Sequence, residues 1–190
     1  QTFQRFEEAG TDLGQLLNRK KAIAMMKSLD GDLDKALGRI SGGLYIVTAS
    51  QGEQNQRRSA MVASWVTQAS FAPPGLSVAV AKDRAIEALM QVGDRFVINV
   101  LREDNYQSLL RHFLRRFPPG ADRFEGINVL ENLAQGGPVL VDALAYLSCR
   151  VEQRLEGPDH WIVYAVVEEG NVSDAEARTA VHHRKVGNHY

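Results

Sequence analysis

Residues 42–49 read GGLYIVTA, and residues 59–74 read SAMVASWVTQASFAPP. The first segment is rich in β-branched and aromatic residues, so we expect a strand over residues 43–50. The second predicts a strand over residues 58–70 with small and hydroxyl-bearing side chains, which ends at a rigid Pro-Pro pair. Because small side chains let a flat ligand approach the backbone closely, these segments predict a binding surface.

Further strands follow on the C-terminal side. Residues 75–81 and 95–101 alternate in polarity or are rich in β-formers, and residues 143–155 and 160–172 form two long strands. The short link at residues 156–159 predicts a hairpin between the last two. The expected fold is therefore mainly β with flanking helices, in a closed or nearly closed antiparallel barrel of Greek-key-like type. The chain has no Gly-x-Gly-x-x-Gly motif after a first strand, which argues against a Rossmann domain.

Two short helices are expected between the strands. Asp83 is the predicted N-cap of a helix over residues 83–92, and Gly93 ends it. A second helix begins at Asp104 and stops at residues 117–120, FPPG. The residues expected to face inward are Ile86, Leu89 and Met90 in the first helix, and Leu109, Leu110, Phe113 and Leu114 in the second.

Residues 1–37 differ from the rest, because their apolar residues recur at helical spacing. Residues 30–32, DGD, are expected to break the second helical run. The two helices either cap the barrel or form the tail of a preceding domain plus a connector. We favour a mixture, in which residues 1 to about 20 belong to an upstream domain and the second run docks on the barrel. Because the chain starts with Gln1, we expect a fragment or a processed product.

The composition excludes several classes of protein. Hydrophobic residues make up 44% of the 190 positions, enough for a packed core, and 22 basic residues balance 23 acidic ones. That balance argues against nucleic acid as the main partner. The single cysteine, Cys149, lies in an expected strand and predicts a buried inert thiol in a reducing, cytoplasmic compartment. The sequence shows neither an apolar run of membrane-spanning length nor a signal peptide.

The small-residue strand predicts a flavin site. An isoalloxazine ring is flat, has apolar faces and needs backbone groups along its edge, and this strand offers small side chains beside apolar ones. The alternative is a small-residue strand that packs under a helix, with Trp65 as a core or interface aromatic. The candidate cofactor-binding residues here are Ser59, Ala60, Met61, Val62, Ala63, Ser64 and Trp65.

Lys82, Asp83 and Arg84 follow the strand at residues 75–81 and open the expected helix. A helix N-terminus with two cations is an anion site, which suits the phosphate of a flavin, although a solvated charged turn is the alternative. His160 follows the hairpin turn, where a neutral imidazole oriented by Asp159 could place a nicotinamide. A turn histidine without a role is the alternative.

Two other groups of side chains are candidates for binding a ligand or a metal ion. Arg111, His112, Arg115, Arg116 and Arg123 form a basic cluster that either meets the phosphates of a pyridine nucleotide, including a 2′-phosphate, or is a solvated helix face. Three histidines crowd the last nine residues, but no carboxylate completes a metal site, and we expect no metal. We interpret this tail as an ordered strand or an extended arm.

Taken in order, several motifs resemble those of the flavin reductase-like, FMN-binding split-barrel family. The similarity covers about residues 38–175. The motifs are LYIVT at 44–48, ASW at 63–65, SFAPP at 70–74, FVINVL at 96–101, LSCRV at 147–151, and DH at 159–160. The segments AMVASW at 60–65, AVAKDRAI at 79–86 and HHRKVGNHY at 182–190 are similar to the C-terminal module of the flavodiiron proteins of oxygenic phototrophs.

The resemblance implies a homodimeric barrel that holds FMN, or FAD, and accepts hydride from NADH or NADPH. It implies that residues 59–65 line the ring, that Ser70 lies by the flavin edge or ribityl chain, that Lys82 and Arg84 hold the phosphate, and that His160 is catalytic near the nicotinamide. Many family members have Thr where this chain has Val62, so we expect a weaker flavin affinity or a shifted potential.

For the full-length protein the resemblance implies flavodoxin-like and diiron domains that reduce oxygen to water. Residues 1–37 would then be the tail of the flavodoxin-like domain, and residues 38–190 the flavin reductase-like domain. A non-catalytic flavin-binding or dimerisation module is the alternative function, and a purely structural barrel is a third.

Overall fold

The structure is a computed structural model that describes residues 32–52, 56–118 and 120–187. The chain divides into two compact units, Gly42–His182 and the segments on either side of it. In the smaller unit, α2 (Leu33–Leu37) lies against residues 184–187, where Arg184 donates to the carbonyl of Leu37 at 3.3 Å. Most of the helical region expected in residues 1–37 lies outside the described residues.

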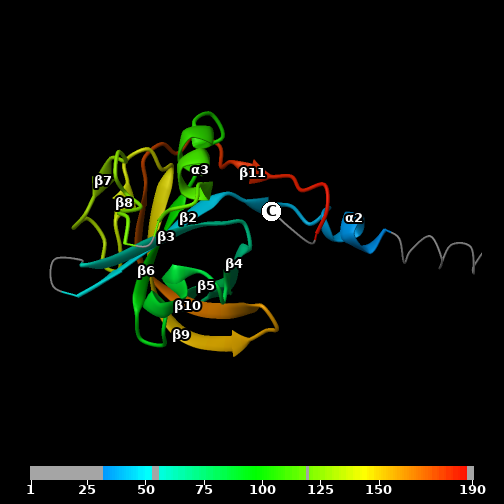
Figure 1. Cartoon of the computed structure of the whole chain (residues 1–190), viewed down its shortest axis with the longest axis horizontal. Coiled ribbons are helices and arrows are strands. Elements are labelled where there is room, and N and C mark those ends of the chain that lie inside the picture. Colours follow the sequence, from blue (N-terminus) through cyan, green and yellow to red (C-terminus); the bar gives the residue numbers. More distant parts are fainter. Residues whose placement is uncertain (1–31, 53–55, 119, 188–190) are drawn as a thin grey trace, which may run out of the picture. The chain divides into compact units, whose positions relative to one another are not determined.

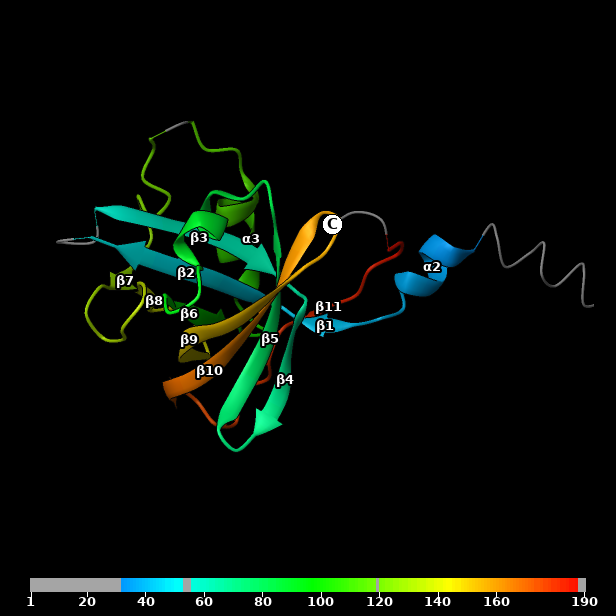
Figure 2. The same cartoon turned by 90° about the horizontal axis from the view of Figure 1, so that it is seen from below.

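The larger unit is built on one antiparallel sheet of seven strands in the order β3-β2-β6-β9-β10-β5-β4. In Figures 1 and 2, β2 and β3 lie on one side of β6, while β5 and β4 lie beyond β10. The strands are β2 (Tyr45–Gln51), β3 (Arg57–Ala63), β4 (Val66–Phe71), β5 (Pro74–Ala81), β6 (Arg95–Val100), β9 (Ala145–Glu156) and β10 (His160–Val172).

Two short strand pairs complete the unit. β1 (Gly42–Gly43) pairs with β11 (Val181–His182), and β7 (Val129–Leu130) pairs with β8 (Val139–Leu140). The first pair confirms the expected strand in the C-terminal tail for Val181–His182. The β9–β10 hairpin is also confirmed, since the Gly157 N–H donates to the His160 carbonyl at 2.8 Å.

The strand expected over residues 58–70 is wrong, because the chain turns a corner at Ser64 and Trp65. This corner separates β3 from β4, and the two strands form opposite edges of the sheet. β3 is largely buried, whereas β4 is mostly exposed and pairs with β5 alone. One straight strand cannot have both environments, and the Trp65 carbonyl fixes the corner by accepting from the Ala79 N–H at 3.0 Å.

The helix expected over residues 83–92 is shorter and tighter than predicted. It is a 3₁₀ helix, η2 (Ala85–Leu89), with Arg84 rather than Asp83 at the N-cap position and no side-chain cap bond. The apolar face is confirmed, since Ile86, Leu89 and Met90 are buried in the barrel core. Gly93, with φ of 90°, adopts the left-handed conformation just after this segment.

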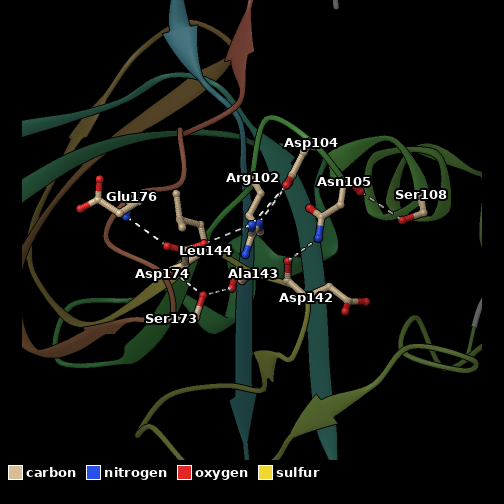
Figure 3. Close-up of polar contacts among 10 residues, drawn as sticks. All are labelled: Arg102, Asp104, Asn105, Ser108, Asp142, Ala143, Leu144, Ser173, Asp174 and Glu176. Carbon is tan, nitrogen blue, oxygen red and sulfur yellow. Dashed lines mark hydrogen bonds and ion pairs between the residues drawn. The ribbon is translucent and has the colours of Figure 1, made fainter.

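The second helix, α3 (Tyr106–Leu114), begins after Asn105 rather than at Asp104. Figure 3 shows the reason: the Asp104 carboxylate accepts from Arg102 at 3.0 and 3.2 Å and is not available to cap a helix. Leu109 and Phe113 are buried and Leu110 is partly buried, as expected, but Leu114 is exposed because the chain leaves the helix at this point.

The sheet separates two apolar clusters. One fills the barrel interior, between β2, β3, β5, β6, β9 and β10, and includes the buried face of η2. The other lies outside β2 and β3, beneath α3 and the segment that carries β7 and β8. Alternation along β3 therefore directs Met61 and Ala63 into the barrel and Ala60 towards α3.

Buried polar groups hold the segment before β8 on the sheet. The Asn99 amide donates to the Ile46 carbonyl at 3.2 Å and accepts from the Leu140 N–H at 2.8 Å. The Thr48 hydroxyl donates to the Pro138 carbonyl at 2.7 Å. These bonds satisfy backbone groups that would otherwise be buried without partners.

A second polar cluster, centred on Arg102, holds the chain between β10 and β11 (Figure 3). Arg102 contacts Asp174 at 3.4 Å, and the Ser173 hydroxyl donates to the Leu144 carbonyl at 2.8 Å. The Asp174 carboxylate in turn accepts from the Glu176 N–H at 3.0 Å. This cluster lies just after the C-terminal end of β6 and fixes the path towards β11.

Candidate functional site

β3 is an edge strand, so its backbone is paired on one side only. It pairs with β2 through residues 57–63, and among the described strands none pairs with its other side. Alternate N–H and C=O groups on that side therefore face away from the sheet. Such an edge offers the backbone donors and acceptors that the rim of a flavin ring needs.

The side chains of β3 are less available than the sequence predicted. Ala60, Met61 and Ala63 belong to the two apolar clusters, and Val62 packs partly against the outer one. Ala60 and Val62 therefore pack beneath a helix, α3, which is the alternative to a flavin-contacting role given in the sequence analysis. Within this chain, what they offer a ligand is mainly their backbone.

Two serine hydroxyls at the ends of β3 are buried without partners. Ser59 and Ser64 are both 4% exposed, and the structure gives neither Oγ atom a hydrogen-bond partner. A buried hydroxyl without a partner costs free energy of about 1–3 kcal/mol, so natural structures retain few of them. This pair is consistent with a polar ligand along β3.

The turn between β5 and η2 carries Lys82 and Arg84 and leads into η2, which contacts β3. The Lys82 ammonium lies 2.7 Å from Glu156 and 5.4 Å from the centre of the Trp161 ring, so it is already paired. Arg84 lies 3.7 Å from the exposed carboxylate of Asp83. Since η2 is a single short 3₁₀ segment, its dipole adds little, and any anion site here depends on the side-chain charges.

The hairpin tip brings His160 to the same region. The Lys82 N–H donates to the Asp159 carbonyl at 3.0 Å, which joins the tip to the β5–η2 turn. His160 Nδ1 lies 3.0 Å from Asp159 Oδ1, and the imidazole lies 5.1 Å from the Trp65 ring between centroids. The hydrogen bond from His160 lowers the pKa of Asp159, so this carboxylate stays charged and fixes the imidazole.

Ser70 lies apart from these residues. It pairs with Gly75 at the far end of the β4–β5 hairpin, whereas Lys82 follows the opposite end of β5. Ala81 lies six residue steps along β5 from Gly75, so the two Cα atoms are about 20 Å apart. The Ser70 hydroxyl donates to the Pro73 carbonyl at 2.5 Å and lies 3.0 Å from the Tyr164 hydroxyl, so it already stabilises this turn.

A cavity of about 490 Å³ opens where β3 begins. Its walls come from the start of β3, from Ala85 and Leu89 of η2, and from the loop after α3. The sequence reasoning missed Arg57 and Asp122, and it placed Arg123 only in a general basic cluster. The signal for Arg57 was its position directly before the small-residue strand. The lining residues with polar or aromatic side chains include Arg57, Arg58, Ser59, Phe117, Asp122 and Arg123.

Within the described residues, neither the cysteine nor a metal-binding cluster adds a reactive group to this site. Burial raises the pKa of the Cys149 thiol to about 12, which confirms a buried, inert cysteine. Among residues 32–52, 56–118 and 120–187, no group of three or more His, Cys, Asp or Glu side chains is placed to hold a metal ion. Within the same residues, no helix is long and apolar enough to cross a membrane.

This combination of an antiparallel barrel, an edge strand of small residues and a charged strand-to-helix turn defines the split-barrel class of flavin-binding proteins. The chain belongs to the flavin reductase-like family: the model of the "flavin reductase like domain" matches residues 37–188. It is 63% identical over 189 residues to diflavin flavoprotein A 1 of Synechocystis sp., covering 100% of this chain and 32% of that protein. The chain thus spans about a third of the length of this relative.

Solved structures agree with the fold. The Streptomyces globisporus NADH:FAD oxidoreductase SgcE6 matches with a TM-score of 0.69 and 25% identity, over 78% of this chain and 85% of that one. The same enzyme in complex with NAD and FAD fragments matches with a TM-score of 0.66 and 24% identity, over 77% and 84% of the two chains. The predicted antiparallel split barrel is confirmed.

Proposed function

We propose that this chain binds FMN, or FAD, along β3 and accepts hydride from NADH or NADPH. The observation that carries the proposal is the free edge of β3, which has two buried hydroxyls without partners beside it and contacts η2, the helix that follows the cationic turn. Membership of the flavin reductase-like family supports it. The flavin, when bound, supplies the redox chemistry, and the protein supplies position and electrostatics.

The edge of β3 would orient the ring. The backbone groups of Ser59–Trp65 would face the rim of the flavin, and the hydroxyl of Ser64 would gain the partner that it lacks. Val62 has no hydroxyl to add, so the ring edge would have one hydrogen bond fewer than in relatives with Thr. We expect a lower flavin affinity or a shifted potential as a result.

The charged turn would hold the flavin phosphate. We assign Lys82 and Arg84 to this role, with Asp83 beside them. Because Lys82 is paired with Glu156 and Arg84 has only a loose contact with Asp83, Arg84 would make the larger contribution. Ser70 remains a proposal for the ribityl chain, although within one chain its hydroxyl already has partners.

His160 would position the nicotinamide. With the Nδ1 proton directed to Asp159, the neutral ring presents Nε2 as an acceptor. It would accept the N–H of the nicotinamide carboxamide, and Asp159 would prevent the ring from flipping. The Trp65 ring beside it would exclude water from this contact.

In the wider protein, we propose that electrons pass from this module to flavodoxin-like and diiron domains that reduce oxygen to water. The support is that the chain matches only 32% of a diflavin flavoprotein, which leaves room for such domains. Residues 1–37 would be the tail of the flavodoxin-like domain. We further propose that the chain forms a homodimer, because Phe71 is 88% exposed and Leu155 and Ile162 form an exposed cross-strand pair. We also propose a cytoplasmic location, as the single cysteine predicts.

Absorption spectroscopy and stopped-flow kinetics test this function. The purified chain should show a flavin spectrum after reconstitution with FMN, and NADH or NADPH should bleach it. If flavin binds but neither nucleotide bleaches it, the module is a non-catalytic flavin carrier or a dimerisation module. If no flavin binds, only the structural barrel remains.

A further inference from the structure

We propose that the cavity at the start of β3 binds a phosphate monoester, held by Arg57, Ser59 and Arg123. Here "the cavity" means the space of about 490 Å³ that these residues line together with Ala85 and Phe117. The proposed function supplies the two ligands that carry such a group, the 5′-phosphate of FMN and the 2′-phosphate of NADPH. The cavity itself is identified without reference to either.

The cavity has positive charge that the protein does not neutralise. Arg58 forms ion pairs with Asp122 at 2.5 Å and with Glu131, so its charge is balanced. Neither Arg57 nor Arg123 forms an ion pair with a carboxylate within the described part of the chain. Burial and the positive charge of Arg84 lower the pKa of Arg123, which shows that a further cation, in only a loose contact with Asp83, lies nearby.

Ser59 adds an observation of a different kind. It lines the cavity, is 4% exposed, and its Oγ has no partner. A hydroxyl in this position could donate to a phosphate oxygen, while the arginines supply charge-assisted bonds. A lining that combines one donor hydroxyl with two guanidinium groups favours an oxyanion over a neutral ligand as the occupant of the cavity.

The arginine on the loop is held in place before any ligand arrives. The Arg123 guanidinium lies 4.9 Å from the centre of the Phe117 ring, and its carbonyl contacts His112 Nε2 at 2.8 Å. Asp122 ties the same loop to β3 through Arg58. A cation positioned in this way binds an anion with a smaller loss of side-chain entropy.

The test compares two ligand pairs that differ only by a phosphate monoester. Affinity is measured for FMN and riboflavin by flavin fluorescence, and KM is measured for NADPH and NADH. The variants are Arg57→Gln, Arg123→Gln, both together, and Ser59→Ala, with Arg178→Gln, at an exposed arginine outside the cavity, as the matched control. Thermal unfolding of each variant checks that the fold is retained.

In one of the two pairs, the double variant should bind the phosphorylated ligand about tenfold more weakly, seen as a higher Kd for FMN or a higher KM for NADPH. The change for its partner, riboflavin or NADH, should be less than about twofold. An effect on FMN would assign the flavin phosphate to this cavity instead of to the β5–η2 turn, and an effect on NADPH identifies the 2′-phosphate. Equal effects within both pairs, no effect at all, or the same effect in Arg178→Gln would overturn the proposal.

A flavin-independent measurement separates this inference from the proposed function. If the parent chain binds neither flavin nor nucleotide, the proposed function fails, and inorganic phosphate then tests the cavity. Phosphate should raise the unfolding temperature of the parent above that in chloride at equal ionic strength, and the double variant should lose this rise. A parent chain that shows no rise contradicts the site.

Discussion

At the scale of single residues, pairing decides which side chains are available to a ligand. Lys82 is engaged by Glu156 and lies over Trp161, whereas Arg84 keeps only a loose contact with Asp83. His160 is fixed by Asp159, and Ser70 is fixed by Pro73 and Tyr164. Residue types alone gave Lys82 and Arg84 the same role, but their contacts rank Arg84 as the more available cation.

We expect Arg84→Gln to weaken FMN binding by about tenfold, and Lys82→Gln to weaken it less, because a charge-assisted bond contributes about 1.5–3 kcal/mol only when the cation is free to make it. The double variant Lys82→Ala with Arg84→Ala should show the full loss. Fluorescence titration measures each affinity. A Lys82 variant that is as impaired as the Arg84 variant would contradict the ranking.

We expect His160→Ala to slow flavin bleaching by NADH or NADPH by about five- to tenfold, which is the effect of about one lost hydrogen bond. The Kd for FMN should stay within about twofold of the parent value. Asp159→Asn is the matched control, since Asn can still accept from Nδ1 and should have a smaller effect. Bleaching rates equal to the parent rate would reduce His160 to a turn residue.

At the scale of secondary structure, local patterns identified most strands, but contacts between distant residues set the boundaries. β-branched runs predicted β2, β5, β6, β9 and β10 within a few residues. No glycine or proline marks the corner at Ser64 and Trp65, so the break between β3 and β4 was missed. The cavity was missed for a similar reason, because it needs Arg57 and Arg123 from separate segments.

The loop that lines the cavity depends on a link between Arg58 and Asp122. Burial raises the pKa of Asp122, but its bonds from Arg58 and the Phe124 N–H outweigh this, and the net pKa is below its ordinary value. Stability from this carboxylate is therefore present above its unfolded pKa of about 3.9 and is lost as the pH falls through the lower, folded value.

We expect Asp122→Asn to lower the free energy of unfolding by about 1 kcal/mol at pH 6, after allowing for solvent screening of a partly exposed pair. As the pH falls towards 2 the difference between variant and parent should shrink, because progressive protonation of the parent carboxylate removes the charge that pairs with Arg58. Urea unfolding at both pH values measures this. A difference that is unchanged by pH would show that charge is not its cause.

The buried bonds of Asn99 predict a larger loss. Asn99→Ala would leave the Leu140 N–H buried without an acceptor and would open a small cavity, so we expect a loss of about 2–4 kcal/mol. Asn105→Ala is the control, since within the described residues the Asn105 side chain makes one hydrogen bond, a long one to the Asp142 carbonyl at 3.4 Å. Similar urea midpoints for the two variants would contradict this role for Asn99.

At the scale of the whole molecule, the sheet presents exposed apolar residues on β4, β9 and β10 that the described part of the chain leaves uncovered. Phe71, Leu155 and Ile162 are the largest of them. Exposed apolar groups on neighbouring strands of this kind are typical of protein interfaces. They support the proposed homodimer.

We expect sedimentation analysis to give twice the mass of one chain, and Ile162→Asp to shift the equilibrium towards the monomer, because burying a charge at an interface is costly. Val92→Asp, a substitution of an exposed apolar residue outside these strands, is the control. A parent chain that sediments as a monomer at micromolar concentration would contradict the dimer.

Both tryptophans of the chain lie beside the proposed site, Trp65 next to His160 and Trp161 beneath Lys82 and Arg154. Indole emission overlaps the absorption of an oxidised isoalloxazine, so the protein contains its own optical sensor for the cofactor. Ultraviolet excitation should therefore follow loading and unloading of the barrel in real time without any attached dye.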